Sequence, residues 1–318
     1  MFNTPILLLV FNRPATTKKV FAQIRKTKPA FLYIAADGPR TDKPGEDAIC
    51  AEVKKSILSN IDWDCKVRTL FRDSNLGCGK AVSEAITWFF EHVEEGIILE
   101  DDTVPSLSFF NYCKIILDRY RDNKEVMIIS GNNFQNGINR GDGSYYFTKY
   151  VHIWGWATWK RTWDLYDFKI EKWKNLRNKN YDQLFINQEE KTYWANIFDK
   201  MYEQEIDTWD FQLYFLTLSN NGLNIVPNLN MVSNIGFNES STHTRDPDHP
   251  LANLKAYDFY NDKIPKSIYS DKDADLYLFN SVYNPSIYSN LMNHSRFGIS
   301  RYLLKIFKKV NFDFLKNT

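Results

Sequence analysis

Short apolar runs alternate with amphipathic stretches over the first 130 residues of the chain. Runs of four to seven mainly apolar residues predict buried strands at 5–11, 30–36, 66–71, 96–99 and 126–130. Apolar residues recur at helical spacing within 15–26, 45–58, 80–93 and 106–120. Strands separated by helices of this length predict βαβ units with right-handed crossovers and a parallel sheet.

The pattern changes after residue 131. Asn, Gly and aromatic residues dominate as far as Trp163, and two longer helical stretches are predicted at 181–203 and 209–218. A short strand is predicted at 223–226, where Pro227 ends it. The chain has no internal repeat and no low-complexity linker, so we expect one compact body with a mixed second half.

Composition excludes some classes of function. The 318 residues carry 40 Lys and Arg against 39 Asp and Glu, so no global positive field attracts nucleic acid. The four cysteines have no zinc-ligand spacing with the five histidines and are predicted to be reduced thiols of a cytoplasmic protein. The apolar run at 6–11 is too short to span a membrane.

The last part of the sequence is basic and amphipathic. Between residues 296 and 316, Lys and Arg interleave with Phe, Leu, Ile and Val. Such a helix can lie on an anionic membrane surface, which would make the protein peripheral at the inner face of a membrane. A terminal helix that packs on the domain with its lysines in solvent is an equal alternative.

Three adjacent carboxylates, Glu100, Asp101 and Asp102, follow the predicted strand at 96–99. Like charges this close suppress one another's ionisation unless a cation is present. Mg²⁺ or Mn²⁺ carrying substrate phosphates would relieve this cost, because both ions prefer oxygen ligands. The alternative is an acidic turn at the start of the next helix, where carboxylates complement the helix dipole.

Polar residues also follow the other predicted strands. Arg13 comes after the first strand, Asp37 after the second and Asn75 after the third. Ligands of parallel sheets bind beyond the carboxyl ends of the strands. We therefore expect these residues and the carboxylate triplet Glu100–Asp102 to share one edge of the sheet.

The ordered set of these motifs resembles a known family. Phe-Asn-Arg-Pro at 11–14, Ala-Asp-Gly at 36–38, Asn-Leu-Gly at 75–77 and Glu-Asp-Asp at 100–102 are similar to motifs of GT-A nucleotide-sugar glycosyltransferases of the family 2-like kind. The triplet and the Trp-rich segment after it look closest to the N-acetylglucosaminyltransferase I branch. The resemblance covers roughly residues 5–245 and implies an α/β, Rossmann-like fold with a mixed, mostly parallel central sheet flanked by helices.

The resemblance implies roles for residues of the first half. Arg13 would pair with phosphate or ribose oxygens, Asp37 would accept a hydrogen bond from the nucleobase, and Lys80 would lie near the base or diphosphate. The alternatives are a surface arginine before proline and an Asp-Gly-Pro turn that needs no ligand. Lys80 stands in the first turn of a helix, where a positive charge opposes the helix dipole.

The resemblance assigns Asp102 to Mn²⁺ or Mg²⁺, with Glu100 and Asp101 facing the donor sugar and ribose. Such a cation bridges the two phosphates and stabilises the departing diphosphate as a Lewis acid. Substrate oxygens and water would supply the remaining ligands.

The second half is expected to provide the acceptor site and a base. Trp156, in Trp-Gly-Trp at 154–156, resembles a segment that borders the donor and acceptor sites, and the alternative is a core tryptophan beside a close backbone approach at Gly155. Asp210, in Trp-Asp at 209–210, resembles the catalytic base, while its alternative is a helix cap. Asp207 is a rival that could be the cap instead, with Asp210 pointing inward.

A loop near residue 240 resembles the segment that closes over the diphosphate. Thr242 and His243 would meet phosphate oxygens there, and His243 is also a candidate second metal ligand. A lone histidine in a loop is more often exposed to solvent.

These features predict a metal-dependent, inverting glycosyltransferase that moves a sugar from a nucleoside-diphosphate sugar, with uridine as the expected base, to a hydroxyl of a glycan or lipid-linked glycan. The predicted division is a catalytic domain at 1–250, made of a nucleotide-sugar half (1–130) and an acceptor half (131–250), and an extension at 251–318. A sugar-nucleotide pyrophosphorylase and a non-catalytic glycan-binding module are the alternatives. The tetrapeptide at 11–14 is not the Gly-rich loop that a pyrophosphorylase carries there.

Overall fold

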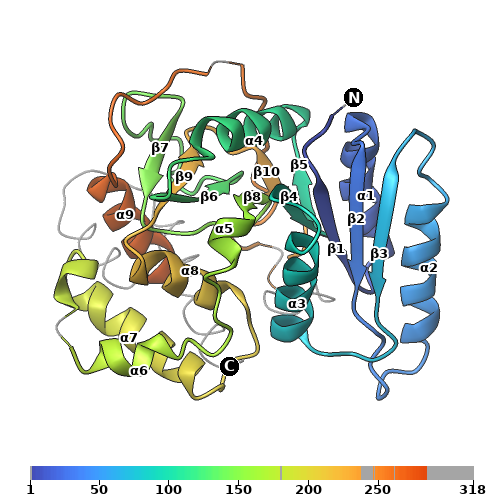
Figure 1. Ribbon diagram of the computed structural model, residues 1–318, viewed down its shortest axis with the longest axis horizontal. Coiled ribbons are helices and arrows are strands. Elements are labelled where there is room, and N and C mark those ends of the chain that lie inside the picture. Colours follow the sequence, from blue (N-terminus) through green and yellow to red (C-terminus); the bar gives the residue numbers. More distant parts are fainter. Residues whose placement is uncertain (1, 180, 238–245, 247, 261, 285–318) are drawn as a thin grey trace.

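The structure is a computed structural model that describes residues 2–179, 181–237, 246, 248–260 and 262–284. An eight-stranded sheet with the order β3-β2-β1-β4-β8-β6-β9-β7 forms its centre (Figure 1). Its strands are β1 (Ile6–Val10), β2 (Phe31–Ala36), β3 (Lys66–Phe71), β4 (Glu95–Glu100), β6 (Val126–Ser130), β7 (Tyr145–Thr148), β8 (Trp156–Trp159) and β9 (Leu223–Pro227). A second, two-stranded sheet pairs β5 (Thr103–Pro105) with β10 (Val232–Asn234).

The central sheet is mixed and mostly parallel. Strands β3, β2, β1 and β4 run parallel to one another, and β6 and β9 form a further parallel pair. Strand β8 lies antiparallel between β4 and β6, and β7 is antiparallel to β9 at the other edge. The chain therefore has the α/β fold class that the sequence predicts.

Helices cover both faces of the sheet. They are α1 (Pro14–Thr27), α2 (Glu46–Leu58), α3 (Cys78–Phe90), α4 (Leu107–Tyr120), α5 (Lys160–Trp163), α6 (Lys172–Arg177), α7 (Gln188–Tyr202), α8 (Asp210–Ser219) and α9 (Lys272–Leu278). Two short turns, η1 (Asp182–Leu184, a 3₁₀ turn) and η2 (Phe279–Tyr283, a π turn), precede α7 and follow α9.

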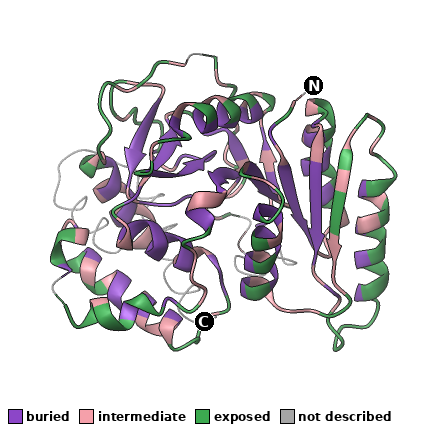
Figure 2. Ribbon diagram, in the orientation of Figure 1, coloured by how far each residue is buried: buried purple, intermediate pink, exposed green. Residues whose placement is uncertain are grey.

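Strand β1 shows how the two faces are built. Its side chains alternate across the sheet, as the two-residue period of a strand requires. Ile6, Leu8 and Val10 pack with α1, α2 and α4, whereas Leu7 and Leu9 face the cluster that contains α3, α7 and α8. Both faces are buried, which explains the continuous apolar run (Figure 2).

The strands and helices expected in the first 130 residues are confirmed, with ends that differ by at most a few residues. The second half differs more. Strands β7 and β8 were not expected. They are short, aromatic and buried on both faces, so their sequences lack the alternation of apolar and polar residues by which a half-buried strand is recognised. The single helix expected over 181–203 is wrong, because the segment forms the short turn η1 and then the helix α7. Asn187 caps α7 by accepting a hydrogen bond from the Glu190 backbone N–H.

The described part of the predicted extension packs on the rest of the molecule. The side chain of Phe279 is buried, and Tyr283 lies against Trp194 of α7 with ring centroids 4.9 Å apart. The segment expected to be basic and amphipathic, 296–316, lies outside the described residues. Among the residues that are described, no helix combines the length and the apolarity that crossing a membrane requires.

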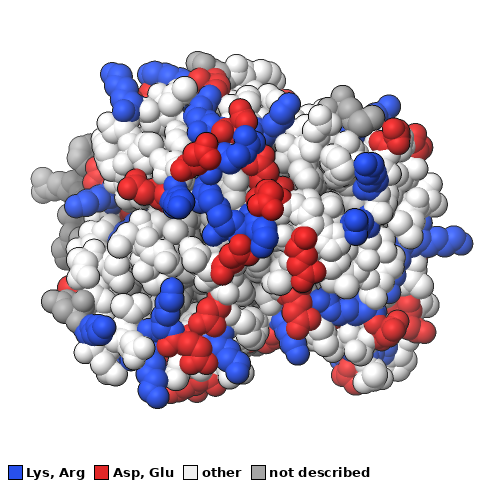
Figure 3. Space-filling view, viewed as in Figure 1, with Lys and Arg blue, Asp and Glu red and all other residues white. Residues whose placement is uncertain are grey.

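Charged side chains of both signs mix on the surface. On the face drawn in Figure 3, Lys and Arg alternate with Asp and Glu, and neither sign forms an extended patch. This mixture agrees with the formal net charge of +1 for the whole chain. It gives no support to a nucleic-acid interface on that face.

Candidate active site

The carboxyl ends of β1 and β4 bring the predicted residues together. Arg13 directly precedes α1, and Asp101 and Asp102 follow β4, which lies beside β1 in the sheet. One guanidinium nitrogen of Arg13, Nη2, lies 2.5 Å from Asp101 Oδ1, and the other, Nη1, lies 2.7 Å from Asp102 Oδ2. The guanidinium therefore spans both aspartates, an arrangement that its planar fork favours.

Negative charge remains in excess at this point. Three carboxylates face one guanidinium, so the group carries two uncompensated negative charges when all three acids are ionised. Burial and the charge of Asp102 raise the pKa of Glu100 to about 8. Burial also raises the pKa of Asp101, although Arg13 opposes that shift. The site thus favours additional positive charge.

The donor set suits a hard divalent cation. The free oxygens are carboxylate oxygens, the ligand class that Mg²⁺ and Mn²⁺ prefer. Within the described residues, no group of three or more His, Cys, Asp and Glu side chains could hold a metal ion alone. A cation at Asp102 would therefore need oxygens from a bound substrate or from water. The backbone at Gly236 lies against Asp102, since a Cβ there would stand 2.1 Å from Oδ2.

Asp37 lies at the end of β2, where its carboxylate holds the turn before α3. It accepts hydrogen bonds from the backbone N–H of Leu76, 3.1 Å from each carboxylate oxygen, and from that of Gly38 at 2.9 Å. The side chain of Asn75 donates to the Gly38 carbonyl. Burial raises the pKa of Asp37, and the Leu76 N–H opposes the shift. These contacts match the turn alternative and leave its proposed base contact untested.

Lys80 lies in the first turn of α3. Its Nζ is 3.8 Å from Glu84 Oε1, and both side chains are about half exposed. The same Glu84 accepts a hydrogen bond from Arg72. The described partner of Lys80 is thus Glu84, a side chain that faces solvent.

Trp156 lies in the core. Its side chain is fully buried and stacked on Trp209 with ring centroids 5.7 Å apart, and its predicted place beside the donor stays a prediction. Gly155 has φ +65°, and a Cβ there would come within 2.8 Å of Val232 Cγ2. The alternative of core packing beside a close backbone approach at Gly155 is the one that the structure matches.

Asp210 opens α8, and its charge is one of the causes that raise the pKa of Glu100. It accepts a hydrogen bond from the Thr208 hydroxyl. Burial raises the pKa of the Cys78 thiol most, and the charges of Glu100 and Asp210 raise it further. The charge of Asp210 also adds to the effect of burial in raising the pKa of Tyr193.

Sequence reasoning missed several residues around Asp210. Cys78, at the start of α3, and three tyrosines feel its charge: Tyr166, Tyr193 and Tyr283. Tyr166 donates a hydrogen bond from its hydroxyl to the Trp209 carbonyl, 2.9 Å away. These side chains come from distant elements and follow no motif, so only the aromatic richness of the second half hinted at them.

Asp207 does not cap α8. Its carboxylate accepts hydrogen bonds from the backbone N–H groups of Cys78 at 3.1 Å and Gly79 at 2.9 Å, at the start of α3. Asp207 therefore caps α3 from the second half of the chain and not the helix that Asp210 opens.

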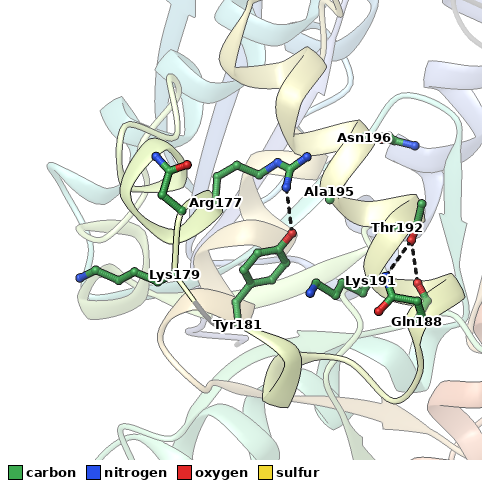
Figure 4. A pocket seen from close by; sticks show the side chains of 9 residues that line it. Arg177, Lys179, Tyr181, Gln188, Lys191, Thr192, Ala195 and Asn196 are labelled. Atoms are coloured by element: carbon green, nitrogen blue, oxygen red, sulfur yellow. Dashed lines mark hydrogen bonds between the residues drawn. The ribbon is translucent and has the colours of Figure 1, made fainter.

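A separate hollow of about 370 Å³ lies along α7 (Figure 4). Arg177, Lys179 and Lys191 provide positive charge at its wall, and Arg177 donates to the Tyr181 hydroxyl. Thr192 and Gln188 lie beside Lys191 on α7 and are hydrogen-bonded to each other. None of the predicted site residues lines this hollow. Thr242 and His243 lie outside the described residues.

Comparisons with known proteins give limited findings. No family model and no curated protein matches the chain. Similar solved structures include HddC from Yersinia pseudotuberculosis (10% identity, TM-score 0.31, 50% of this chain and 78% of that chain) and S. aureus TarS 1–349 (11%, 0.34, 50% and 48%). A second structure of HddC, complexed with GMP-PN, is also similar. The match has 9% identity and a TM-score of 0.30, and it covers 49% of this chain and 77% of that chain. At these scores the comparisons assign neither ligand nor activity, and the N-acetylglucosaminyltransferase I resemblance stays a prediction.

Proposed function

We propose that the chain is a metal-dependent, inverting glycosyltransferase that uses a nucleoside-diphosphate sugar, with uridine as the expected base. One observation carries this proposal. The triplet at the end of β4 has one guanidinium for three carboxylates, and the charge of a fourth carboxylate, Asp210 in the second half, adds to the raised pKa of Glu100. That distribution suits a cation and a diphosphate on one side and a proton acceptor on the other.

Arg13 would change partners when the donor binds. In the structure it forms ion pairs with both Asp101 and Asp102. A diphosphate offers the same guanidinium a matching pair of anionic oxygens. The proposal therefore requires Arg13 to give up Asp102 and contact the donor, which frees a carboxylate at the moment when positive charge arrives.

Asp102 would hold Mn²⁺ or Mg²⁺, and Glu100 and Asp101 would face the donor sugar and ribose. The bound cation would supply Lewis-acid stabilisation of the leaving diphosphate. Asp37 and Lys80 would lie on the nucleobase and diphosphate side, and Thr242 and His243 would close over the phosphates. For Asp37 this requires an exchange of the backbone partners at Leu76 and Gly38.

Asp210 would act as the general base. An acceptor hydroxyl is a weak nucleophile, so its proton must leave as the oxygen attacks the anomeric carbon. The oxygen forms the new glycosidic bond opposite the departing diphosphate, the proton passes to the Asp210 carboxylate, and the configuration inverts. The acceptor would be a glycan or a lipid-linked glycan. Membrane association depends on the segment 296–316, and its deletion with unchanged membrane recovery would contradict it.

A donor-hydrolysis screen over common nucleotide sugars tests the proposal. The parent should hydrolyse at least one donor slowly in the presence of Mn²⁺ or Mg²⁺, and Asp102→Ala should abolish that hydrolysis. Asp62→Ala is the matched control, because Asp62 is exposed and pairs with Arg25 away from the site. A pyrophosphorylase would instead release nucleoside triphosphate when given pyrophosphate, and a glycan-binding module would hydrolyse no donor.

A further inference from the structure

The segment before Asp210 is fastened to the start of α3. Asp207 lies 128 and 129 positions along the chain from the two residues whose N–H groups it accepts, Gly79 and Cys78. Helix α3 has no side-chain cap of its own, and no acidic residue stands in its first turn. Asp207 therefore supplies from the second half the negative charge and the acceptor oxygens that this helix start lacks.

Two glycines make this approach possible. A Cβ on Gly77 would stand 2.7 Å from Asp207 Oδ2, and Gly77 also has φ +81°. A Cβ on Gly79 would stand 2.7 Å from Asp207 Oδ1 and 2.7 Å from the Thr208 carbonyl oxygen. Both contacts are closer than side-chain carbons tolerate, so the carboxylate fits only against a helix start without side chains at these positions.

The same segment fixes the start of α8. Thr208 donates its hydroxyl to the Asp210 carboxylate. Trp209 stacks on the buried Trp156, and its carbonyl accepts a hydrogen bond from Tyr166. Asp207 is the link that ties this set of contacts to α3, since it accepts hydrogen bonds from the first two residues of that helix, Cys78 and Gly79.

We infer that Asp207 is a positioning residue, which holds Asp210 at a set place relative to the carboxylate triplet by clasping the first turn of α3. This inference rests on the proposed function of Asp210 as base. Both oxygens of Asp207 are engaged by backbone N–H groups, so Asp207 itself is not a second base. Its loss leaves Asp210 chemically intact and lets the start of α8 move against the triplet.

The effect should appear in turnover and not in donor affinity. A base displaced by about 1 Å loses on the order of 10²-fold in rate. We expect Asp207→Ala to lower kcat for donor hydrolysis by about 10- to 100-fold with the donor KM unchanged. Asp207→Asn keeps one acceptor oxygen and should fall between Asp207→Ala and the parent.

Hydrogen–deuterium exchange gives a readout that needs no activity. In Asp207→Ala, peptides covering 206–212 and 77–81 should both exchange about tenfold faster than in the parent, because the clasp joins the two segments. Asp62→Ala, in the full chain, is the control and should change neither. Faster exchange confined to 77–81 would overturn the inference, since Asp207 would then be only a cap of α3.

The kinetic outcomes separate the inference from the proposal on which it rests. If Asp210→Asn loses turnover while Asp207→Ala keeps the parent kcat, the positioning role is wrong and the base assignment stands. If Asp210→Asn keeps turnover, the base assignment is wrong, and the exchange at 206–212 decides whether the clasp exists. An equal loss of kcat and rise of KM in Asp207→Ala would also overturn the inference, because misfolding of the donor site would explain both.

Discussion

Two acidic sites of the molecule, a cluster of three carboxylates and a single aspartate, differ in how far the protein compensates their negative charge. At the end of β4, Glu100, Asp101 and Asp102 share a single guanidinium. At the start of α3, Asp207 has both oxygens occupied by backbone N–H groups. The first group is left with excess charge and the second is satisfied within the protein. A cluster of carboxylates indicates a ligand only when the fold leaves its charge uncompensated.

The largest difference between the two regions should be seen in turnover. Asp210→Asn removes the proposed base, and general base catalysis contributes about 10²- to 10⁴-fold. Donor hydrolysis should fall by that factor with donor affinity unchanged, whereas Asp207→Asn should lose about tenfold. Steady-state kinetics with the donor found by screening measures both. Equal losses in the two variants would erase the distinction between a reacting and a positioning aspartate.

Arg13→Gln should have the next largest effect, on stability. It leaves three carboxylates without their guanidinium, and breaking a buried ion pair costs about 3–5 kcal/mol. The melting temperature should drop by several degrees, and saturating Mn²⁺ should restore more of it in Arg13→Gln than it adds to the parent.

Arg25→Gln is the matched control for that experiment. Arg25 pairs with Asp62 on the surface, so its melting temperature and its response to Mn²⁺ should match the parent. If Mn²⁺ fails to stabilise Arg13→Gln, the triplet does not bind the cation in the absence of a donor, and the charge excess would then have to be relieved by protonation alone.

The first half of the chain was predictable because strands that are buried on both faces of the sheet have continuous apolar sequences. Strand β1 and the polar residues at its end are an example, and the rule for parallel sheets placed Arg13 near the triplet. Its pairing with Asp101 and Asp102 was not expected, because the resemblance assigned the guanidinium to a ligand. Residue type and strand end predict the neighbourhood but not the partner.

The second half was less predictable for a physical reason. Strands β7 and β8 are short and aromatic, and their residues read equally well as core or as a sugar platform. Trp156 is core. The cap that Asp207 gives α3 joins residues about 130 positions apart, and local cap patterns extend over only three or four residues.

Glu100 provides a pH test of the charge excess. Its pKa in the folded protein, about 8, lies above the usual 4.5, because burial and Asp102 oppose ionisation. The unfolded chain loses this proton first, so stability should fall as pH rises from about 4.5 to about 8. Glu100→Gln should flatten that fall and raise the free energy of unfolding at pH 8 by about 2 kcal/mol. This is less than the pKa shift alone implies, because the Glu100 side chain is partly exposed.

Thermal unfolding from pH 5 to pH 8.5, without divalent cations, measures this effect. Glu52→Gln on the exposed side of α2 is the control and should keep the slope of the parent. A parent whose melting temperature is flat over this range would show that the triplet carries no excess charge.

Gly79→Ala should have the smallest effect, and it changes the contact between Asp207 and the start of α3. The added Cβ meets Asp207 Oδ1 and the Thr208 carbonyl oxygen at 2.7 Å, so the clasp must shift, at a cost of about 1–3 kcal/mol. Lys80→Ala, one residue along on the exposed side of the same turn, should cost less. Denaturant unfolding compares them, and equal stability of Gly79→Ala and the parent would argue against a tight clasp.

Titration calorimetry of uridine diphosphate, with and without Mn²⁺, shows whether the acids at the end of β4 hold a cation. The parent should bind the nucleotide much more tightly with Mn²⁺, and Asp102→Ala should lose the metal-dependent part while Asp62→Ala keeps it. Binding of equal strength with and without Mn²⁺, or metal-dependent binding that survives in Asp102→Ala, would contradict the claim that the acids at the end of β4 hold a cation with the donor.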